Sequence, residues 1–376
     1  MVAILRLCAL LTPAESRRSS DDGRPISVTG GVLDTANAAL VTPRLWDVLV
    51  KGGAAGSVPA DLSAFMQRFH ALNRTRNALL ARQLAEAARS INAAGVRPMV
   101  LKGGIALLAD DANLRARRVI TDLDLQIPEA SAGVVEGALA DLGYGRLRSY
   151  RANPHAHAIA DLERAGDLAT IDLHRYLLSF SGHRSGRTHL AGLLPPEQVR
   201  ARAAVVRTGG AEMLLPSPRD QILHLILQDQ VQDRDHFAGR IKLRRLLDLS
   251  DLLRENPDVD TEALVAQVRP YGLATAARSH LYAAHALFRA PVGEGIRTSL
   301  AARVHHRRRT WAAEHPRAVV VNVLLGAIAY EFARCRFPPG ADARTLLRWR
   351  LARLADVLNR RRFGVAHRLQ DVASRL

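Results

Sequence analysis

The stretch RPMVLKGGIALLADDANLRARRVITDLDLQI, residues 97–127, decides the fold and the chemistry expected of this chain. It predicts an apolar strand at 99–101, a Lys-Gly-Gly turn at 102–104, a short apolar helix, a basic loop, and a second strand carrying Asp122 and Asp124. Residues two apart in a strand point to the same side. Both carboxylates therefore leave one face of the strand, while the leucines between and after them bury on the other.

Two carboxylates this close repel each other, and a bound cation relieves the repulsion. Oxygen ligands of this kind suit Mg²⁺, which proteins commonly hold with one or two carboxylates plus substrate phosphates. Gly103 and Gly104 allow the backbone to approach a ligand, and the N–H groups at a helix start favour anions. The stretch therefore predicts a metal site facing a phosphate cradle, which describes a nucleotide-handling centre.

The run LKGG…RxxxDLDL resembles the polymerase-β-like nucleotidyltransferase superfamily, in particular a bacterial group of uncharacterised nucleotidyltransferases. That group reads LKGxxL, a spacer, and then RxxSDIDLLV. Lys102 and Gly103 match the LKG, Arg118 matches the arginine four before the first aspartate, and Asp122 and Asp124 match the aspartate pair.

Three positions depart from the superfamily pattern. Thr121 stands where serine is common, and Gln126 interrupts the usual apolar continuation. The Gly-Ser of better-known members is absent, and Gly103-Gly104 stands near its place, so the role of a hydroxyl in phosphate binding is not matched. A GG turn also occurs in toxin-type nucleotidyltransferases of the abortive-infection kind, which this chain resembles in that respect.

A third carboxylate, Asp172, follows in the segment ATIDLH, which predicts a strand at 168–173. The resembling group often reads D/E-L-H followed by an aromatic; Asp172 and His174 match, whereas Arg175 takes the aromatic position and Tyr176 follows. The resemblance implies that Asp172 binds a second metal ion or acts as general base toward the acceptor. For His174 three roles stay open: orienting Asp172, contacting the acceptor, or a structural hydrogen bond.

The resemblance implies an α+β fold. A polymerase-β-like core, a small mixed sheet with helices, is expected at 95–215, after an N-terminal helical segment (1–94) and before a C-terminal helical domain (216–376). The implied activity is Mg²⁺- or Mn²⁺-dependent transfer of a nucleoside monophosphate from an NTP, the co-substrate, to a hydroxyl or phosphate acceptor. The predicted catalytic and metal-binding residues are Asp122, Asp124 and Asp172, and those predicted to bind the nucleotide are Lys102, Gly103, Gly104 and Arg118.

Several basic residues keep two interpretations each. Lys102 contacts a triphosphate as a point charge, or is a surface lysine at a strand end. Arg118 neutralises the triphosphate or pairs with Asp122.

The segment RIKLRRLLDLSDLL, residues 240–253, is similar to a helix of the family with the form RxxxLxDxxxL. Its Arg244 and Arg245 either approach the nucleotide or pair with Asp248 and Asp251 across helix turns. The pairing is the expected role for at least one of them.

Elsewhere, apolar periodicity and turn residues predict further elements. The expected helices and strands are a long helix at 60–94, a helix at 130–142, strands at 144–150 and 155–162, a helix entered through Ser217-Pro218, and a basic amphipathic segment at 343–376. His155 and His157 share a strand face at a spacing that permits metal binding, but no third ligand lies nearby in sequence.

Composition bounds the partners. The 376 residues carry a net charge of +17, and 48% are apolar, as in ordinary globular proteins. The arginines are spread along the chain, so charge alone does not identify a nucleic-acid binder. The runs at 305–309 and 360–362 are expected to be solvated helix faces; the alternative is that these basic C-terminal helices bind RNA.

Two lone cysteines, Cys8 and Cys335, favour a reducing setting, and the longest apolar run, 318–329, is too short to span a bilayer. We therefore predict a cytoplasmic protein that does not enter a membrane. Competing hypotheses are a catalytically weak NTP- or RNA-binding module with the same fold, a toxin-like RNA nucleotidyltransferase, and another phosphotransfer enzyme. The sequence leaves open the acceptor (small molecule, peptide, protein or RNA), the base preference and the oligomeric state.

Overall fold

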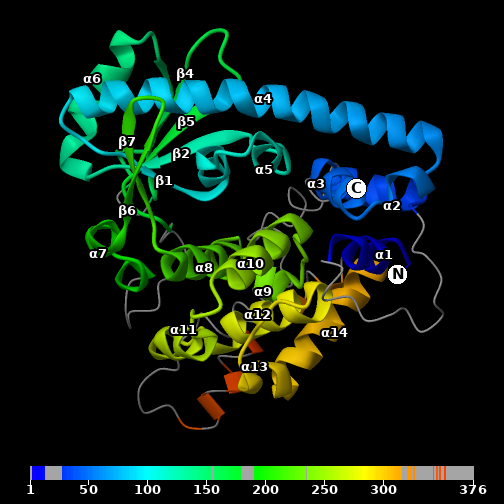
Figure 1. The fold of residues 1–376 in the computed structure, drawn as a ribbon. Helices are drawn as coiled ribbons and strands as arrows, with labels where there is room; N and C mark the ends of the chain where they lie inside the picture. The colour runs from blue at the N-terminus through cyan, green and yellow to red at the C-terminus, as the bar shows by residue number, and fades with distance from the viewer. Residues whose placement is uncertain are drawn as a thin grey trace.

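A mixed seven-stranded sheet lies between one long helix and a group of shorter ones (Figure 1). The computed structural model describes residues 2–12, 28–153, 156–178, 190–233 and 235–315, with isolated positions between 321 and 352. The fold is thus α+β, as the sequence predicts.

The sheet has the strand order β3-β4-β5-β2-β1-β7-β6. Strand β2 runs parallel to β5 and β1 parallel to β7, whereas the other neighbours are antiparallel. The strands are β1 (Met99–Val100), β2 (Asp122–Gln126), β3 (Gly145–Ser149), β4 (Ala158–Glu163), β5 (Thr170–His174), β6 (Ala204–Thr208) and β7 (Ala211–Leu215). The hairpin of β6 and β7 extends the sheet beyond the strands that the sequence pattern identifies.

The described helices confirm the long helix predicted at 60–94 and the helix predicted after Ser217. They are α1 (Val2–Leu11), α2 (Gly30–Ala38), α3 (Thr42–Lys51), α4 (Ala60–Ala93), α5 (Ala112–Ala116), α6 (Ala132–Asp141), α7 (Pro196–Arg202), α8 (Pro218–Leu227), α9 (Asp235–Ala238), α10 (Leu243–Glu255), α11 (Thr261–Val268), α12 (Ala274–Phe288), α13 (Glu294–Thr298) and α14 (Leu300–Glu314). A 3₁₀ helix at Lys102–Leu108 follows β1, and a π-helical turn at Gln228–Gln232 follows α8.

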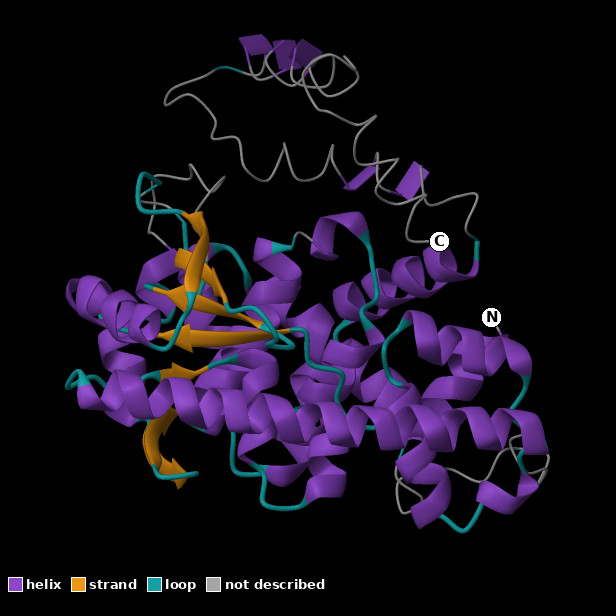
Figure 2. Ribbon diagram, turned by 90° about the horizontal axis from the view of Figure 1, so that it is seen from above, coloured by secondary structure: helices purple, strands orange, loops and turns teal. Residues whose placement is uncertain are grey.

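One apolar core joins α4 and α6 to the sheet. Leu80, Leu84, Ala88 and Ile91 recur at helical spacing on α4 and bury against strand residues such as Leu123. Figures 1 and 2 show α4 lying across the sheet and continuing past it toward the N-terminal helices. The face of the sheet under α4 is therefore closed to ligands.

A second apolar core joins the N-terminal helices to the C-terminal ones. Leu7 and Leu45, from α1 and α3, belong to the same buried cluster as Leu246 and Leu281, from α10 and α12. The C-terminal helices of this group lie opposite α4, on the other side of the sheet, whereas α3 packs against the end of α4 that extends past the sheet, with α2 beside it (Figure 1). The domain boundaries after residues 94 and 215 stay predictions.

The basic run at 305–309 corrects the expectation of a solvated face. Among its arginines only Arg307 is exposed, whereas Arg309 is 1% exposed and donates to the Arg240 carbonyl at 2.6 and 3.0 Å. Arg309, on α14, thus donates to a backbone oxygen of the segment between α9 and α10. Its guanidinium is buried against protein and not hydrated. The run at 360–362, His155, Cys335 and most of 343–376 lie outside the described residues.

No helix in the described part of the chain has the length and apolarity needed to cross a membrane. Cys8 is a buried free thiol in α1, and burial raises its pKa to about 12. Such a thiol is inert, because the thiolate is the reactive form.

Candidate active site

The two aspartates of β2 share the open face of the sheet with Asp172 of β5. Parallel pairing places Asp124 level with Asp172, while Leu123 and Leu125, both 0% exposed, bury on the opposite face. The register therefore brings Asp124 and Asp172 together and places Asp122 on the same face, level with Thr170. We call Asp122, Asp124 and Asp172 the sheet cluster.

Asp124 is 1% exposed and has two close partners. Lys102 Nζ lies 2.6 Å from one carboxylate oxygen, and His174 Nε2 lies 2.7 Å from the same oxygen. Burial pushes the pKa of Asp124 up, but Lys102 and His174 outweigh burial and hold that pKa below its usual range. The histidine thus orients Asp124 and not Asp172, and Lys102 is partly buried on a carboxylate and not a surface lysine.

The turn after β1 differs from the expected glycine turn. Its left-handed residue is Lys102, with φ 50°, while neither glycine has a positive φ. A Cβ on Gly103 would lie 3.3 Å from Arg118 Nε, and one on Gly104 would lie 2.9 Å from Val100 Cγ1. The glycines are therefore needed for close packing, and Gly103 lets the Arg118 guanidinium lie against the turn.

Two buried asparagines of α4 hold the loop that carries Arg118. Asn73 donates to the carbonyls of Ala116 and Arg118 at 2.7 and 3.0 Å, and Asn77 donates to those of Arg115 and Arg118 at 2.7 and 2.8 Å. Buried amides that satisfy loop carbonyls fix the loop in place. The helix that closes one face of the sheet thus positions the entry to β2 on the other.

Arg118 pairs with Asp248 of α10, which corrects the proposed pairing with Asp122. Asp122 instead accepts a hydrogen bond from Thr121 Oγ1 at 3.0 Å. Burial, together with the positive charges of Arg244 and Arg245, lowers the pKa of Arg118 to about 9.

The two arginines of α10 also differ from expectation. Arg245 pairs with Asp229 and, at 3.2 Å, with Asp233, while Arg244 donates to the Val119 carbonyl at 3.1 Å. Neither pairs with Asp248 or with Asp251, which accepts from Arg44 of α3 at 2.7 Å. Contacts between distant elements, not neighbours along the helix, decide these partners.

Asp161 on β4 is a residue that sequence reasoning missed. Antiparallel register places it level with Asp172, and Tyr150 donates to it at 2.8 Å. Burial raises the pKa of Asp172 to about 7, and Asp124, Asp161 and Asp122 raise it as like charges. The sequence could have indicated Asp161, because it lies four residues after His157 in the strand predicted at 155–162, and alternation in a strand places both on the same face.

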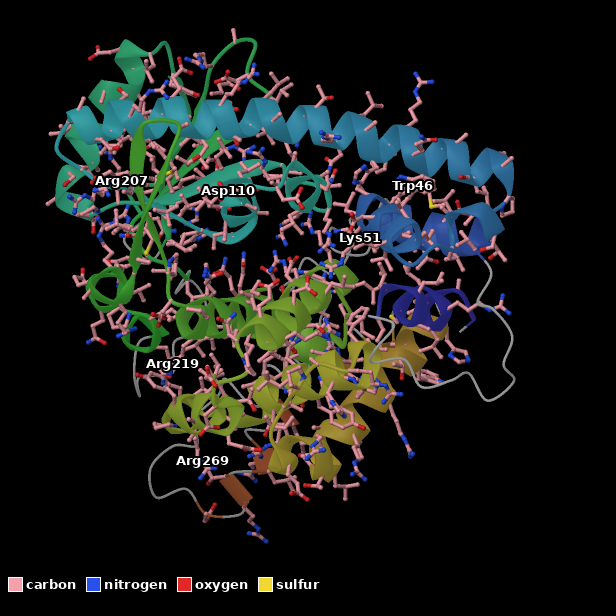
Figure 3. The ribbon with its side chains drawn as sticks, in the orientation of Figure 1. Trp46, Lys51, Asp110, Arg207, Arg219 and Arg269 are labelled. Carbon is pink, nitrogen blue, oxygen red and sulfur yellow. The ribbon has the colours of Figure 1, made fainter. Side chains whose placement is uncertain are left out.

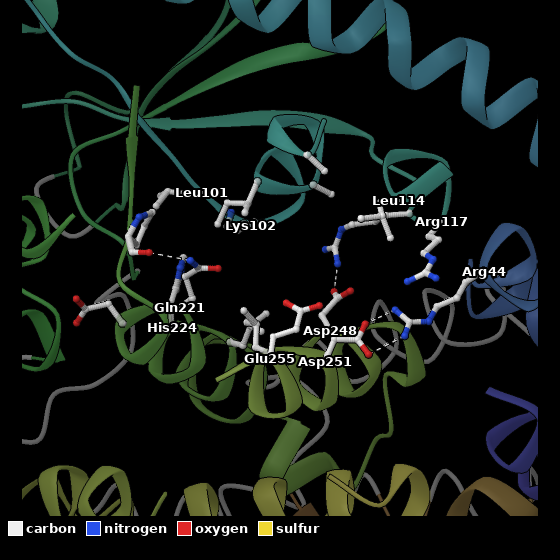
Figure 4. A pocket seen from close by; sticks show the side chains of 18 of the residues that line it. Arg44, Leu101, Lys102, Leu114, Arg117, Gln221, His224, Asp248, Asp251 and Glu255 are labelled. Atoms are coloured by element: carbon white, nitrogen blue, oxygen red, sulfur yellow. Dashed lines mark hydrogen bonds and ion pairs between the residues drawn. The ribbon is translucent and has the colours of Figure 1, made fainter. Parts of the chain in front are cut away.

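A cavity of about 300 Å³ opens beside the sheet cluster, between the turn after β1 and helices α8 and α10 (Figure 4). Its lining includes Lys102 and Arg118 from the sheet side, and His224, Asp248 and Glu255 from the helices. His224 is buried, and burial lowers its pKa to about 3, so the imidazole is neutral. The cavity combines an apolar wall with cations. Asp122, Asp124 and Asp172 do not line it, and Lys102 connects it to the sheet cluster by its ion pair with Asp124.

The donor atoms suit a divalent cation. One oxygen each of Asp124 and Asp172 and one nitrogen of His174 lie within 4.8 Å of one another. A cation there would offset the repulsion that raises the pKa of Asp172. A second acidic group, the helix cluster of Asp229, Asp233 and Asp235, has equally close oxygens.

Comparison with known proteins agrees with this geometry. Residues 30–289, more than half of the chain, match the family described as uncharacterised nucleotidyltransferase, and the chain belongs to that family. It is accordingly an enzyme of the nucleotidyltransferase class. None of the curated proteins matches the chain.

Among solved structures, the chain is similar to the antibiotic-resistance factor ANT(2'')-Ia, known from a solution structure. The identity is 14% and the TM-score 0.34, and the match covers 54% of this chain and 97% of the other.

Proposed function

We propose that the enzyme transfers a nucleoside monophosphate from an NTP to a hydroxyl or phosphate acceptor, with Mg²⁺ or Mn²⁺, on a polymerase-β-like core. The supporting observation is the sheet cluster: three carboxylates from two paired strands on one open face, beside a cavity lined by Lys102 and Arg118. Excess negative charge next to cations is the arrangement that a metal-bound triphosphate needs.

Asp122 and Asp124 would hold the metal, with Asp172 as a ligand of a second ion or as the general base, and His174 orients Asp124. A divalent ion at this place neutralises phosphate charge and aligns the reacting oxygens. His174 acts as the outer partner that fixes a ligating carboxylate, a role that commonly tunes metal affinity.

Asp172 is the proposed general base toward the acceptor. In this role Asp172 is not itself a metal ligand, and burial with the neighbouring carboxylates raises its pKa to about 7, near the operating pH. The carboxylate takes the proton from the acceptor hydroxyl as that oxygen attacks the α-phosphate, and pyrophosphate leaves.

Lys102, Arg118 and the turn at Gly103 and Gly104 are proposed to hold the triphosphate. Lys102 contributes a point charge, and the guanidinium of Arg118 offers a planar fork that matches phosphate oxygens. Both side chains line the cavity, and Lys102 links it to the sheet cluster through its contact with Asp124.

The second candidate is a module that binds NTP or RNA without catalysis. Its support is the departure from Gly-Ser and the polar Gln126, whose amide donates to the Ile127 carbonyl at 2.8 Å. RNA as acceptor, a toxin-like activity and a cytoplasmic location remain proposals.

The deciding experiment is Mg²⁺-dependent incorporation of each α-labelled NTP into a cell extract. Native protein is expected to transfer label, and the Asp122→Asn/Asp124→Asn variant to lose at least about 10³-fold in rate, because the metal ligands are gone. The labelled species identifies the acceptor. Nucleotide binding without transfer from any NTP would favour the binding module, and absence of nucleotide binding would refute the site.

A further inference from the structure

Arg244 is a cation without an anionic partner beside the sheet cluster. Among the described residues, the other cations of this region each form an ion pair: Arg118 with Asp248, Arg245 with Asp229, and Lys102 with Asp124. Arg244 has no carboxylate within 4.0 Å among those residues, and its one hydrogen bond goes to the Val119 carbonyl.

Arg244 connects α10 to the loop that enters β2. Its side chain reaches from the first turn of α10 to the backbone just after Arg118 and three residues before Asp122. One helical turn later, Asp248 of α10 binds Arg118. Two contacts therefore attach the start of α10 to the loop that enters β2.

Local charge is unfavourable for Arg244 unless an anion is present. Burial lowers its pKa, and Arg245 lowers it as a like charge, while Asp122 and Asp229 partly compensate. The start of α10 also carries the positive end of the helix dipole, and its first turn holds no acidic residue. Cations at a helix N-terminus oppose that dipole, so the surroundings favour a polyanion.

Resting on the proposed function, we propose that Arg244 and Arg118 together bind the pyrophosphate part of the NTP, so that the nucleotide joins the sheet to the helical group. Asp122 is near enough to raise the pKa of Arg244 and forms no ion pair with it among the described residues, so a phosphate bound by Arg244 would lie near a proposed metal ligand. Arg244 is thus a nucleotide-binding residue contributed by the helices, in addition to those proposed on the sheet side. It stabilises the charge that develops on the leaving pyrophosphate.

The test is calorimetric binding of tripolyphosphate, the α,β-methylene analogues of the four NTPs, and the corresponding NMPs, in Mg²⁺. For Arg244→Gln, the Kd of tripolyphosphate and of the bound analogue is expected to rise about 10–100-fold, because a charge-assisted fork is lost. The Kd of an NMP is expected to stay the same. Arg244→Lys should fall between, because lysine keeps the charge and loses the planar fork.

Arg219→Gln is the matched control, since it also removes one positive charge from the helical group. Arg219 is exposed, bonds Gln267 at 2.6 Å, and lies on the side of α8 away from the sheet (Figure 3). Its variant should bind tripolyphosphate as the native protein does. Thermal unfolding without ligand should be nearly unchanged for Arg244→Gln, because only one hydrogen bond to a carbonyl is removed.

Native-like tripolyphosphate affinity of Arg244→Gln, equal losses in both variants, or no binding by native protein would overturn the inference. If transfer of labelled nucleotide occurs while Arg244→Gln binds normally, the inference alone fails. If tripolyphosphate binding depends on Arg244 but no NTP is ever transferred, the anion site stands and the proposed function fails.

Discussion

The sheet cluster and the helix cluster contain the same side chains and differ in their partners. In the helix cluster every carboxylate has a cation: Asp229 binds Arg245, Asp233 binds Lys242 at 2.6 Å, and Asp235 binds Arg240 at 2.7 Å. In the sheet cluster only Asp124 is paired with a cationic side chain, Lys102, among the described residues.

This difference indicates a structural role for the helix cluster and a ligand-binding role for the sheet cluster. Charges that the chain neutralises itself tie the π-helical turn, α9 and α10 together, and they need no ligand. Asp172, which the chain leaves without a cation among the described residues, has its pKa raised to about 7 and can accept a cation or a proton. Burial also raises the pKa of Asp229 in the helix cluster to about 6, so the ion pairs and not the pKa values distinguish the two clusters. Acidic spacing alone does not distinguish the two clusters, whereas their partners do.

The largest effect is expected from Asp172→Asn. Transfer should fall about 10²–10⁴-fold, because a general base is lost. The folded protein should gain about 1–3 kcal/mol at pH 8, because a partly buried carboxylate repelled by its neighbours is removed. Labelled-NTP assays and urea unfolding measure the two effects, with Asp258→Asn, an exposed aspartate, as control. Lost stability together with lost activity would assign Asp172 a structural role.

Arg245→Gln should show the opposite pattern in the helix cluster. The variant leaves Asp229 buried without its guanidinium, which is expected to cost about 2–4 kcal/mol of unfolding free energy. Divalent-ion affinity, measured by the electron paramagnetic resonance of Mn²⁺, should change less than in Asp124→Asn. A gain in Mn²⁺ affinity without a loss of stability would mean that the helix cluster is itself a metal site.

Acid should affect the buried histidines and Asp172 in opposite directions. Burial lowers the pKa of His236 and His306 to about 4 and that of His305 to about 2, with Arg308 and Arg309 nearby. The unfolded chain protonates these histidines near pH 6.5, so the stability that each contributes is lost as pH falls from 6.5 toward 4. At pH 5 each should cost up to about 2 kcal/mol.

For Asp172 the sign is reversed, because its pKa in the folded protein lies above the unfolded value. Its destabilising effect appears as pH rises from about 4 to 7. Urea unfolding at pH 7, 6 and 5 measures the sum, in which the buried histidines should dominate. Burial also lowers the pKa of His157 and His224 to about 3, and that of His280 well below its usual value, so these three contribute in the same direction. His305→Gln should flatten the profile, and an equally steep profile in that variant would contradict the assignment.

The smallest effect is expected from Arg307→Ala, the exposed arginine of the run at 305–309. Unfolding free energy should change by less than about 0.5 kcal/mol. If α14 binds RNA, the variant should reduce the slope of log Kd against log salt concentration by about one. An unchanged slope would exclude this arginine from any RNA contact.

Period and turn chemistry predicted much of the fold. The spacing Asp122-Leu123-Asp124-Leu125 placed the carboxylates and leucines on the faces where they lie, because alternation in a strand is a local property. Apolar recurrence on α4 and the Ser217-Pro218 entry to α8 predicted those helices for the same reason.

Partner choice was predicted least well. Arg118, for which pairing with Asp122 was one of two interpretations, binds Asp248. His174, for which orienting Asp172 was one of three open roles, bonds Asp124. Each partner lies 50 or more residues away in the chain, and spacing along the sequence carries no information about such contacts.

The sequence by itself determined which residue types face one side of β2 and β5, and with the family match it determined the class of enzyme. Only the tertiary structure decided which charges are neutralised. Strand register brought Asp161 to Asp172, and the packing of α10 against the loop at Arg118 left Arg244 without a carboxylate. The physical reason is that side-chain direction follows from local backbone geometry, whereas the pairing and desolvation of charges depend on distances between segments that only folding sets.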